Sequence, residues 1–210
     1  MSASRQRPAL GPPPADLSKF PRSKLSPDAE LYRAHTVANS QWWFSSNLSG
    51  RFDVNQPNGT CYLATDTASA LRERFGHDLV RQGVVTFRAA ARTQVSKLQV
   101  PSLRWLANTC SPRVASFGMT REIGTCPSYK FPQAWAAGFF GGRKHSGIRY
   151  QSRFSTGPKP NSVALFDLAG QQGWPTDPNP IDGVQACTNE GIRVERAPTR
   201  RQVQIVQPPE

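Results

Sequence analysis

The chain has 210 residues, enough for one domain of ordinary size, and 37% of them are hydrophobic, including 11 Phe, 5 Trp and 4 Tyr. Its 26 Lys and Arg exceed its 14 Asp and Glu, so the net charge is +12 and the pI is near 10.3. This length excludes two full-sized cores. The charge favours an anionic partner or a substrate that carries phosphates, although an arginine-rich genome composition would produce the same surplus.

The N-terminal residues 1–28 contain six prolines and few large apolar groups, which predicts a flexible Pro-rich tail or a strap along the surface. They lack the apolar segment of a signal peptide. The longest apolar run, AWAAGFF at 134–140, is too short to span a bilayer. We therefore expect a soluble cytoplasmic protein that has no membrane partner.

The ordered domain is expected over residues 29–168, where strand and helix patterns alternate densely. Strands are predicted at residues 31–35, 60–65, 83–90, 147–154 and 162–168. One helix is predicted over 67–75, capped by Asp66 and ended by Gly76, and a second over 132–140 with Pro132 in its first turn. These elements lack a strict βαβ rhythm, which favours an α+β domain, a mixed β core flanked by helices.

The C-terminal residues 169–210 are expected to be a Pro/Gly-rich extension. Within it, residues 170–191 are interpreted as a loop, and residues 200–207 are predicted to add an edge strand. This extension is therefore not expected to contain a second core.

Several classes of site are excluded by missing motifs. The four cysteines, at 61, 110, 126 and 187, have no CxxC or zinc spacing, so we expect no metal. Either Cys110 and Cys126 pair, or all four remain thiols in a reducing compartment. No G-x-S-x-G, H-E-x-x-H, P-loop or G-x-G-x-x-G sequence is present. No nucleic-acid-binding module is visible, so we do not expect a nucleic acid partner.

Two arginines near the start of the domain are candidate site residues. Arg33 shares a strand face with Leu31, so it either lies in water at the strand end or points into a cleft. Arg51 follows a glycine in SGRFD at 49–53, a pattern that is also common turn chemistry. Neither arginine alone identifies a function.

Two later positions also have alternative interpretations. Glu73 lies between Arg72 and Arg74, opposite the apolar face of its helix. It is either a solvated helix residue or a carboxylate presented to a cleft. In GIRYQSRF at 147–154, Ser152 interrupts an apolar face that includes Tyr150. Its hydroxyl either bonds to the backbone or lines a site.

Five segments follow one another over residues 29–168: an arginine in the first strand, Gly-Arg-aromatic, YLATDTASALRE, YKFPQAWA and GIRYQSR. In this order they resemble the RES domain family. The family is named for arginine, glutamate and serine. Its members are mostly toxins of bacterial toxin–antitoxin pairs that act on NAD, with a fold related to ADP-ribosyltransferases. The chain departs from the pattern at Asp53, where asparagine or serine is more usual, and Arg74 lies outside it.

The resemblance implies a set of site residues. The family's arginine corresponds to Arg33 or Arg51, its glutamate to Glu73 and its serine to Ser152. Gln133 matches the family's Q-x-W step together with Trp135. The implied catalytic residues are Glu73, Arg33 and Ser152, and the implied NAD-binding residues are Arg51, Tyr62, Tyr150, Arg153 and Gln133. If this is right, the Glu73 carboxylate and the Ser152 hydroxyl should open on one pocket.

The resemblance also implies a function. NAD would be the substrate, with no cofactor, and cleavage of its nicotinamide–ribose bond would make the protein an NAD glycohydrolase or NAD phosphorylase. A separately encoded antitoxin would be its protein partner. Two alternatives stay open: a protein ADP-ribosyltransferase on the same fold, and a non-catalytic basic protein that binds nucleic acid or an acidic partner.

Overall fold

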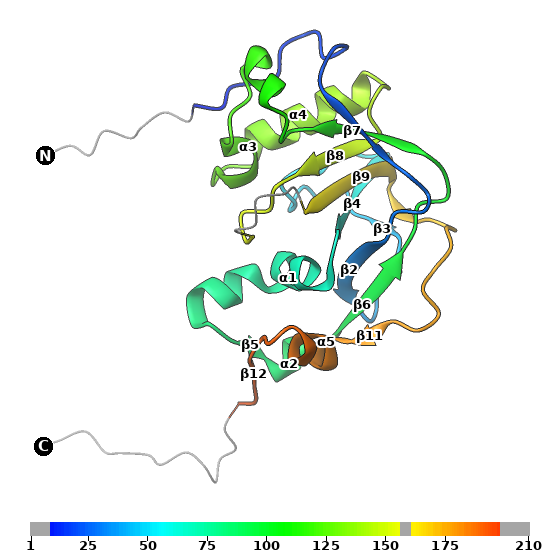
Figure 1. Ribbon diagram of the computed structural model, residues 1–210, viewed down its shortest axis with the longest axis vertical. Helices are drawn as coiled ribbons and strands as arrows, with labels where there is room; N and C mark the ends of the chain where they lie inside the picture. The colour runs from blue at the N-terminus through cyan, green and yellow to red at the C-terminus, as the bar shows by residue number, and fades with distance from the viewer. Residues whose placement is uncertain (1–8, 156–160, 198–210) are drawn as a thin grey trace, which may run out of the picture.

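The computed structural model describes residues 9–155 and 161–197 and is built on an eight-stranded sheet (Figure 1). The strand order is β1-β7-β8-β9-β4-β2-β6-β11, and neighbours are antiparallel except β7 and β8. The strands are β1 (Arg22–Leu25), β2 (Leu31–Thr36), β4 (Asn58–Ala64), β6 (Thr93–Leu98), β7 (Arg104–Asn108), β8 (Gly147–Tyr150), β9 (Ser162–Leu168) and β11 (Ile181–Asp182). The mixed sheet confirms the predicted α+β class, and β2, β4 and β9 confirm three predicted strands.

The sheet is weakly joined between β2 and β4. These two strands pair only at Tyr32 and Ala64. By contrast, β4 pairs with β9 at seven positions and β2 pairs with β6 at six. The sheet therefore has two well-paired parts, and side chains of β2 and β4 can face a shared space where these parts diverge.

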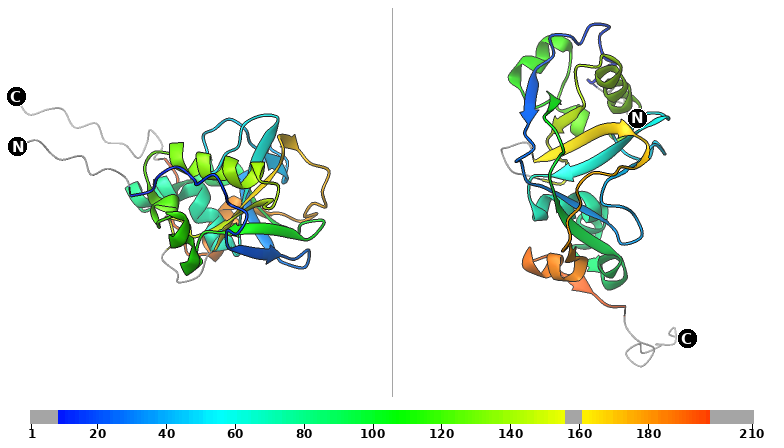
Figure 2. Two further views of the ribbon diagram at one scale, coloured as in Figure 1. Left: turned by 90° about the horizontal axis from the view of Figure 1, so that it is seen from above. Right: turned by 90° about the vertical axis from the view of Figure 1, so that its right-hand side faces the viewer.

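Helices cover the two parts separately (Figure 1). The part containing β7 and β8 carries α3 (Glu122–Thr125), α4 (Lys130–Gly141) and the 3-10 turn η1 (Pro112–Phe117). The part containing β2 and β6 carries α1 (Thr67–Gln82), α2 (Phe87–Ala91) and α5 (Gly183–Asn189). In the right-hand view of Figure 2, α5 lies at the bottom of the molecule and α4 at the top. Two-residue strands form two further pairs: β3 (Trp43–Phe44) with β10 (Gly170–Gln171), and β5 (Val85–Thr86) with β12 (Val194–Glu195). No helix in the described ranges is long and apolar enough to cross a membrane.

The core is rich in aromatic side chains under α4 and mostly aliphatic under α1. Trp135 and Phe139 of α4 are fully buried against a cluster that includes Phe20, Phe52 and Ile148. Burying each such side chain stabilises the fold by about 1.5–3 kcal/mol. Under α1, a separate cluster is built on Leu71, Phe75 and Val95. The helix expected at 132–140 is confirmed as α4, and all four cysteines are free thiols.

The expectation of a flexible tail over residues 1–28 is wrong for the part that the structure describes. Residues 22–25 form β1, an edge strand paired with β7. Leu10 and Phe20 are buried, and the Phe20 ring packs 4.6 Å from the Phe139 ring, centroid to centroid. The Trp135 indole N–H donates to the Gly11 carbonyl at 2.9 Å. A few large apolar groups thus fix the Pro-rich segment as a strap across α4.

The first helix is longer than predicted. Asp66 caps α1 as expected, since its carboxylate accepts the Ser69 N–H at 2.7 Å. However, α1 continues through Gly76 to Gln82 and ends at Gly83, whose φ of 69° is left-handed. Gly76 serves packing instead, because a Cβ there would lie 2.3 Å from the Phe154 ring. A helical glycine can therefore mark a close contact and not a helix end.

Two predicted strands are shorter than expected. In the 83–90 segment only Val85 and Thr86 are extended, because the Thr86 hydroxyl accepts the Ala89 N–H and starts α2. In the 147–154 segment β8 ends at Tyr150. Beyond it the Ser152 hydroxyl accepts the Phe154 N–H at 3.1 Å, which turns the chain.

The 170–191 segment is also more ordered than predicted. It contains β10, β11 and α5, whose first turn is capped by the Asp182 carboxylate accepting the Val184 N–H at 2.8 Å. The many Pro and Gly residues of this segment therefore gave no indication of the short capped helix α5. The edge strand expected at 200–207 lies outside the described residues.

Candidate functional site

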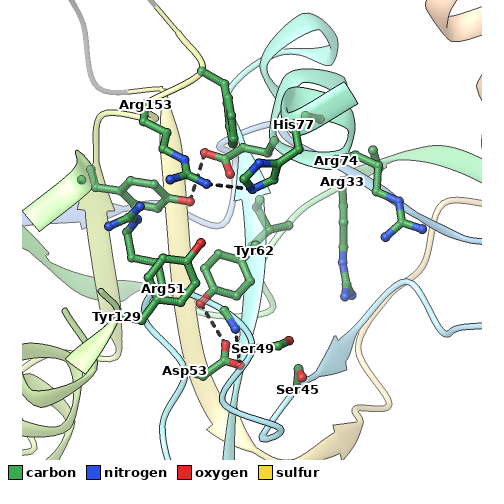
Figure 3. A pocket seen from close by; sticks show the side chains of 18 of the residues that line it. Arg33, Ser45, Ser49, Arg51, Asp53, Tyr62, Arg74, His77, Tyr129 and Arg153 are labelled. Carbon is green, nitrogen blue, oxygen red and sulfur yellow. Dashed lines mark hydrogen bonds between the residues drawn. The ribbon is translucent and has the colours of Figure 1, made fainter. Parts of the chain in front are cut away.

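A cleft of about 450 Å³ opens where β2 diverges from β4. Its walls come from β2, β4, α1, the 49–53 loop and the end of β8 (Figure 3). The charged side chains that line it are Arg33, Arg51, Asp53, Glu73, Arg74 and Arg153, and the tyrosines are Tyr32, Tyr62, Tyr129 and Tyr150. Four arginines against two carboxylates make the cleft cationic, and its aromatic walls suit a planar ring.

Glu73 is a partly buried carboxylate of α1 that is held by two hydroxyl groups. Its Oε1 accepts hydrogen bonds from the Tyr150 and Ser162 hydroxyls, each at 3.4 Å. Burial, followed by the nearby Glu73 charge, raises the pKa of Tyr150 well above its usual value. Tyr150 is therefore a neutral donor, and Glu73 is anchored toward the cleft rather than solvated.

The 49–53 loop is fixed by a buried carboxylate. Asp53 is 1% exposed and accepts the Gly50 N–H at 2.9 Å and the Tyr62 O–H at 2.8 Å. The Tyr62 hydroxyl in turn accepts the Phe52 N–H at 2.8 Å. Burial raises the pKa of Asp53, an effect that these hydrogen bonds oppose. We call Gly50, Asp53 and Tyr62 the Asp53 network.

The Asp53 network presents Arg51 to the cleft. The Arg51 Nη1 donates to the Cys126 carbonyl at 2.8 Å, and its guanidinium lies 4.7 Å from the centre of the Tyr129 ring. Arg51 is only 8% exposed, and its Nη2 has no hydrogen-bond partner in the described part of the chain. A buried, unpartnered guanidinium nitrogen in a cleft is suited to binding an anion.

Arg33 and Arg74 lie together on the side of the cleft opposite Arg51 (Figure 3). The Arg33 guanidinium donates to three carbonyl oxygens, those of Ser40, Gln41 and Trp43. Arg74 makes no side-chain hydrogen bond within residues 9–155 and 161–197. Partial desolvation, followed by the Arg33 charge, lowers the pKa of Arg74.

Arg153 lines the cleft and contacts α1. Its Nη2 lies 2.8 Å from the Nε2 of His77, and because an arginine can only donate, the hydrogen bond runs from Arg153 to His77. The Arg153 guanidinium also lies 4.7 Å from the centre of the Phe154 ring, the ring that packs on Gly76. The segment after β8 is thus attached to the helix that carries Glu73.

Comparison with known proteins identifies the family. The sequence profile of the RES domain matches residues 30–181, which is more than half of the chain. This chain belongs to the RES domain family. The match ends beyond Leu168, where the sequence had suggested the end of the domain, and so includes β10.

A solved structure shares the RES domain fold. A chain of the crystal structure of the M. tuberculosis MbcT–MbcA toxin–antitoxin complex matches with a TM-score of 0.60 at 10% sequence identity. The match covers 78% of this chain and 88% of that chain. No curated protein sequence matches this one. The structural match confirms the predicted fold.

Six of the eight site residues expected of the RES domain line the cleft: Arg33, Arg51, Tyr62, Glu73, Tyr150 and Arg153. The other two, Gln133 and Ser152, do not line the cleft. Gln133 donates from α4 to the Leu48 and Gly50 carbonyls, both at 2.9 Å, and so supports the 49–53 loop. Ser152 is 2% exposed, and its hydroxyl holds the turn at Phe154. The expected opening of the Ser152 hydroxyl onto the cleft is therefore not found, because β8 ends two residues earlier.

Sequence reasoning missed several residues of the site. His77 follows Glu73 by four positions, a spacing that places both on one helix face and could have revealed it. The family resemblance does not mark Arg74 as a site residue, because Arg74 lies outside the family pattern. No local signal marks Tyr129, or Ser162, which pairs with Tyr150 across β8 and β9. These residues reach the cleft only through tertiary packing.

Proposed function

We propose that this RES domain cleaves the bond between nicotinamide and ribose in NAD. The observation that carries the proposal is an anchored carboxylate, Glu73, in a cleft whose lining includes four arginines and four tyrosines. The cleft volume of about 450 Å³ lies within the usual range for ligand pockets.

The arginines support a ligand that carries a pyrophosphate. No ion pair neutralises a cleft arginine in the described part of the chain, where the ion pairs are Lys97–Glu30, Arg104–Asp167 and Arg193–Glu195. A pyrophosphate accepts charge-assisted hydrogen bonds from guanidinium groups, and Arg51 has an unpartnered Nη2 for this purpose. The tyrosine rings provide surfaces for the nicotinamide and adenine rings.

Glu73 supports the chemical step. When the bond from the ribose C1′ to the nicotinamide nitrogen breaks, its electron pair moves to that nitrogen and neutralises the pyridinium. Positive charge then develops on the ribose, and a fixed carboxylate stabilises it more in the transition state than in the ground state. The Tyr150 and Ser162 hydroxyls hold the carboxylate in place, so little reorganisation is needed.

An oxygen nucleophile completes the reaction at C1′ and loses its proton. Water would give ADP-ribose, inorganic phosphate would give ADP-ribose 1″-phosphate, and a protein side chain would give a modified protein. No oxidant or metal is needed for the atoms and electrons to balance. Mass analysis of the products identifies the acceptor.

We further propose that the protein is the toxin of a toxin–antitoxin pair, because the solved structure that shares its fold comes from a toxin–antitoxin complex. Expression in a bacterium that lacks the cognate antitoxin should slow growth and lower cellular NAD. The Glu73→Gln variant, expressed at the same level, should do neither. Growth arrest with unchanged NAD would instead favour modification of a protein.

The decisive test is nicotinamide release by the purified full-length protein. Glu73→Gln keeps the shape of the side chain but removes its charge, and we expect it to lower the rate about 10²–10³-fold. Glu190→Gln is the matched control, because Glu190 is exposed beyond the end of α5 and does not line the cleft. Full activity in Glu73→Gln would contradict the role of Glu73, and no release by the wild type would contradict the proposed function.

A further inference from the structure

We propose that Arg33 and Arg74 form a phosphate subsite for a phosphate additional to the pyrophosphate of the dinucleotide. This inference rests on the proposed function, since it assigns the pyrophosphate to the other side of the cleft. Arg74 lies outside the RES family pattern, so the subsite would be a property of this chain. It would determine which phosphorylated compound the cleft accepts.

The pair is a concentration of like charge, and neither arginine forms an ion pair with a carboxylate in the described part of the chain. Both side chains line one cavity and lie on the same side of it (Figure 3). Partial desolvation, and after it the charge of Arg33, lowers the pKa of Arg74. The carboxylates that line this cavity are engaged elsewhere, Asp53 with Gly50 and Tyr62, and Glu73 with Tyr150 and Ser162. Two adjacent guanidinium groups repel one another, and a bound dianion would turn that repulsion into attraction.

Arg33 gives the subsite a fixed geometry. Its Nη1 and Nη2 already donate to the carbonyls of Ser40, Gln41 and Trp43, which holds the guanidinium plane in one orientation. Each terminal nitrogen of a guanidinium carries two N–H donors, so hydrogen-bonding capacity remains. Arg74 is exposed and follows Glu73 on α1, so it can adjust its side chain to a ligand.

The position of the pair separates it from the pyrophosphate site. Arg51, with its unpartnered Nη2, lies across the cleft beside Tyr129, whereas Arg33 and Arg74 lie on the opposite side (Figure 3). Cationic groups on both sides of a cleft are suited to two anionic groups. The reacting ribose would lie near Glu73, whose hydroxyl donors come from β8 and β9 and not from the Arg33 side.

The additional phosphate can come from two sources with the same chemistry. One is free inorganic phosphate bound beside the dinucleotide. The other is a phosphate monoester on the dinucleotide itself, such as the 2′-phosphate of NADP. Both are dianionic near neutral pH and match two guanidinium groups.

The test measures binding by calorimetry at constant ionic strength, which does not depend on turnover. The three probes are ADP, ADP that carries a 2′-phosphate, and inorganic phosphate in the presence of saturating ADP. We expect the wild type to bind the 2′-phosphorylated ADP about tenfold more tightly than ADP, or to bind inorganic phosphate beside ADP. The first result identifies the monoester as the source, and the second identifies free phosphate.

Arg74→Gln should remove about tenfold of that added affinity and change the affinity for ADP by about twofold or less. Arg72→Gln is the matched control, because Arg72 is an exposed arginine of α1 that does not line the cleft. Arg74→Lys, which keeps the charge but not the planar fork, should retain part of the added affinity. Melting temperatures of all variants check that each is folded.

Two outcomes would overturn the subsite. Equal losses of affinity for ADP and for 2′-phosphorylated ADP in Arg74→Gln would show that the pair binds the pyrophosphate. An unchanged affinity for every probe, or a wild type that gains nothing from the additional phosphate, would show that the pair binds no such group. A wild type that binds this phosphate but releases no nicotinamide from NAD contradicts the proposed function and leaves the phosphate subsite in place.

Discussion

On one side of the cleft, Gly50, Asp53 and Tyr62 satisfy one another's hydrogen bonds. On the other side, Arg33 and Arg74 lie together, and neither is paired with a carboxylate among residues 9–155 and 161–197. Asp53 is 1% exposed and binds two donors, whereas Arg74 is exposed and repelled by its neighbour. The two sides belong to the two parts of the sheet, which pair at only one position between β2 and β4.

The two sides of the cleft therefore have different roles: one fixes the shape of the site, and the other is available to bind a ligand. The Asp53 network is complete without a ligand, so it sets the shape of the 49–53 loop and the position of Arg51 in advance. The positive charges of the Arg33–Arg74 pair are not balanced by a carboxylate in the described part of the chain. A bound anion would therefore change the electrostatic energy of this pair more than that of the Asp53 network. Damage to the network should therefore reduce the stability of the free protein, and damage to the pair should not.

The largest effect is expected from Asp53→Ala. This change leaves the partly buried Gly50 N–H and Tyr62 O–H without their acceptor, which should lower the free energy of unfolding by about 3 kcal/mol. Urea denaturation measures this loss. Asp78→Ala on α1 is the control, since the Asp78 carboxylate makes no hydrogen bond in the described part of the chain. A loss no greater than that of the control would break the proposed distinction between the two sides.

A smaller effect is expected from Gly50→Ala. An added Cβ would lie 2.4 Å from the Asp53 Oδ1 and 2.5 Å from the Tyr62 hydroxyl oxygen, so the network must shift. We expect a loss of about 2 kcal/mol in the free energy of unfolding, and slower nicotinamide release as Arg51 moves. Gly173→Ala is the matched control, because a Cβ there would meet no atom within 4 Å. Unchanged stability and activity in Gly50→Ala would show that the loop is not held tightly.

The smallest effect is expected from Arg74→Gln in the absence of ligand. Removing one of two repelling charges should raise the free energy of unfolding by a few tenths of a kcal/mol at low salt. The gain should vanish at about 1 M salt, where the charges are screened. Thermal unfolding at both salt concentrations, with Arg72→Gln for comparison, measures it. A clear loss of stability in Arg74→Gln would mean that Arg74 supports the fold.

Much of the fold follows from local pattern. The strands that became β2, β4 and β9 and the helix α4 have regular apolar periodicity, and Asp66 is a strong N-cap signal. The strand and loop predictions that were wrong also have local causes. Thr86 initiated a helix inside an apolar run, and Asp182 capped one inside a Pro/Gly-rich run. For residues 1–28 the sequence allowed either a tail or a surface strap, and it did not place the strap on α4, because its few apolar residues become informative only once Trp135 and Phe139 provide their contacts.

The site was predictable in so far as the family pattern named its residues. Glu73 and Arg51 do line the cleft, but their partners come from distant segments: Ser162 for Glu73, and Cys126 for Arg51. Such pairs are set by strand register and loop packing, which a single sequence does not specify. For Ser152 the family pattern was misleading. It predicted that the Ser152 hydroxyl lines the cleft, whereas this hydroxyl accepts a hydrogen bond from the nearby Phe154 N–H.

The contact between Gly76 and Phe154 constrains how this sequence can change over evolutionary time. Any side chain at position 76 would overlap the aromatic ring, since even a Cβ would lie 2.3 Å from it. A homologue that gains a larger residue at position 76 must therefore carry a smaller one at position 154, or must release that segment from α1. Because Arg153 and His77 flank this contact, the two positions should change as a pair, and lineages that change them together should differ in how the segment after β8 is held against α1 at the wall of the cleft.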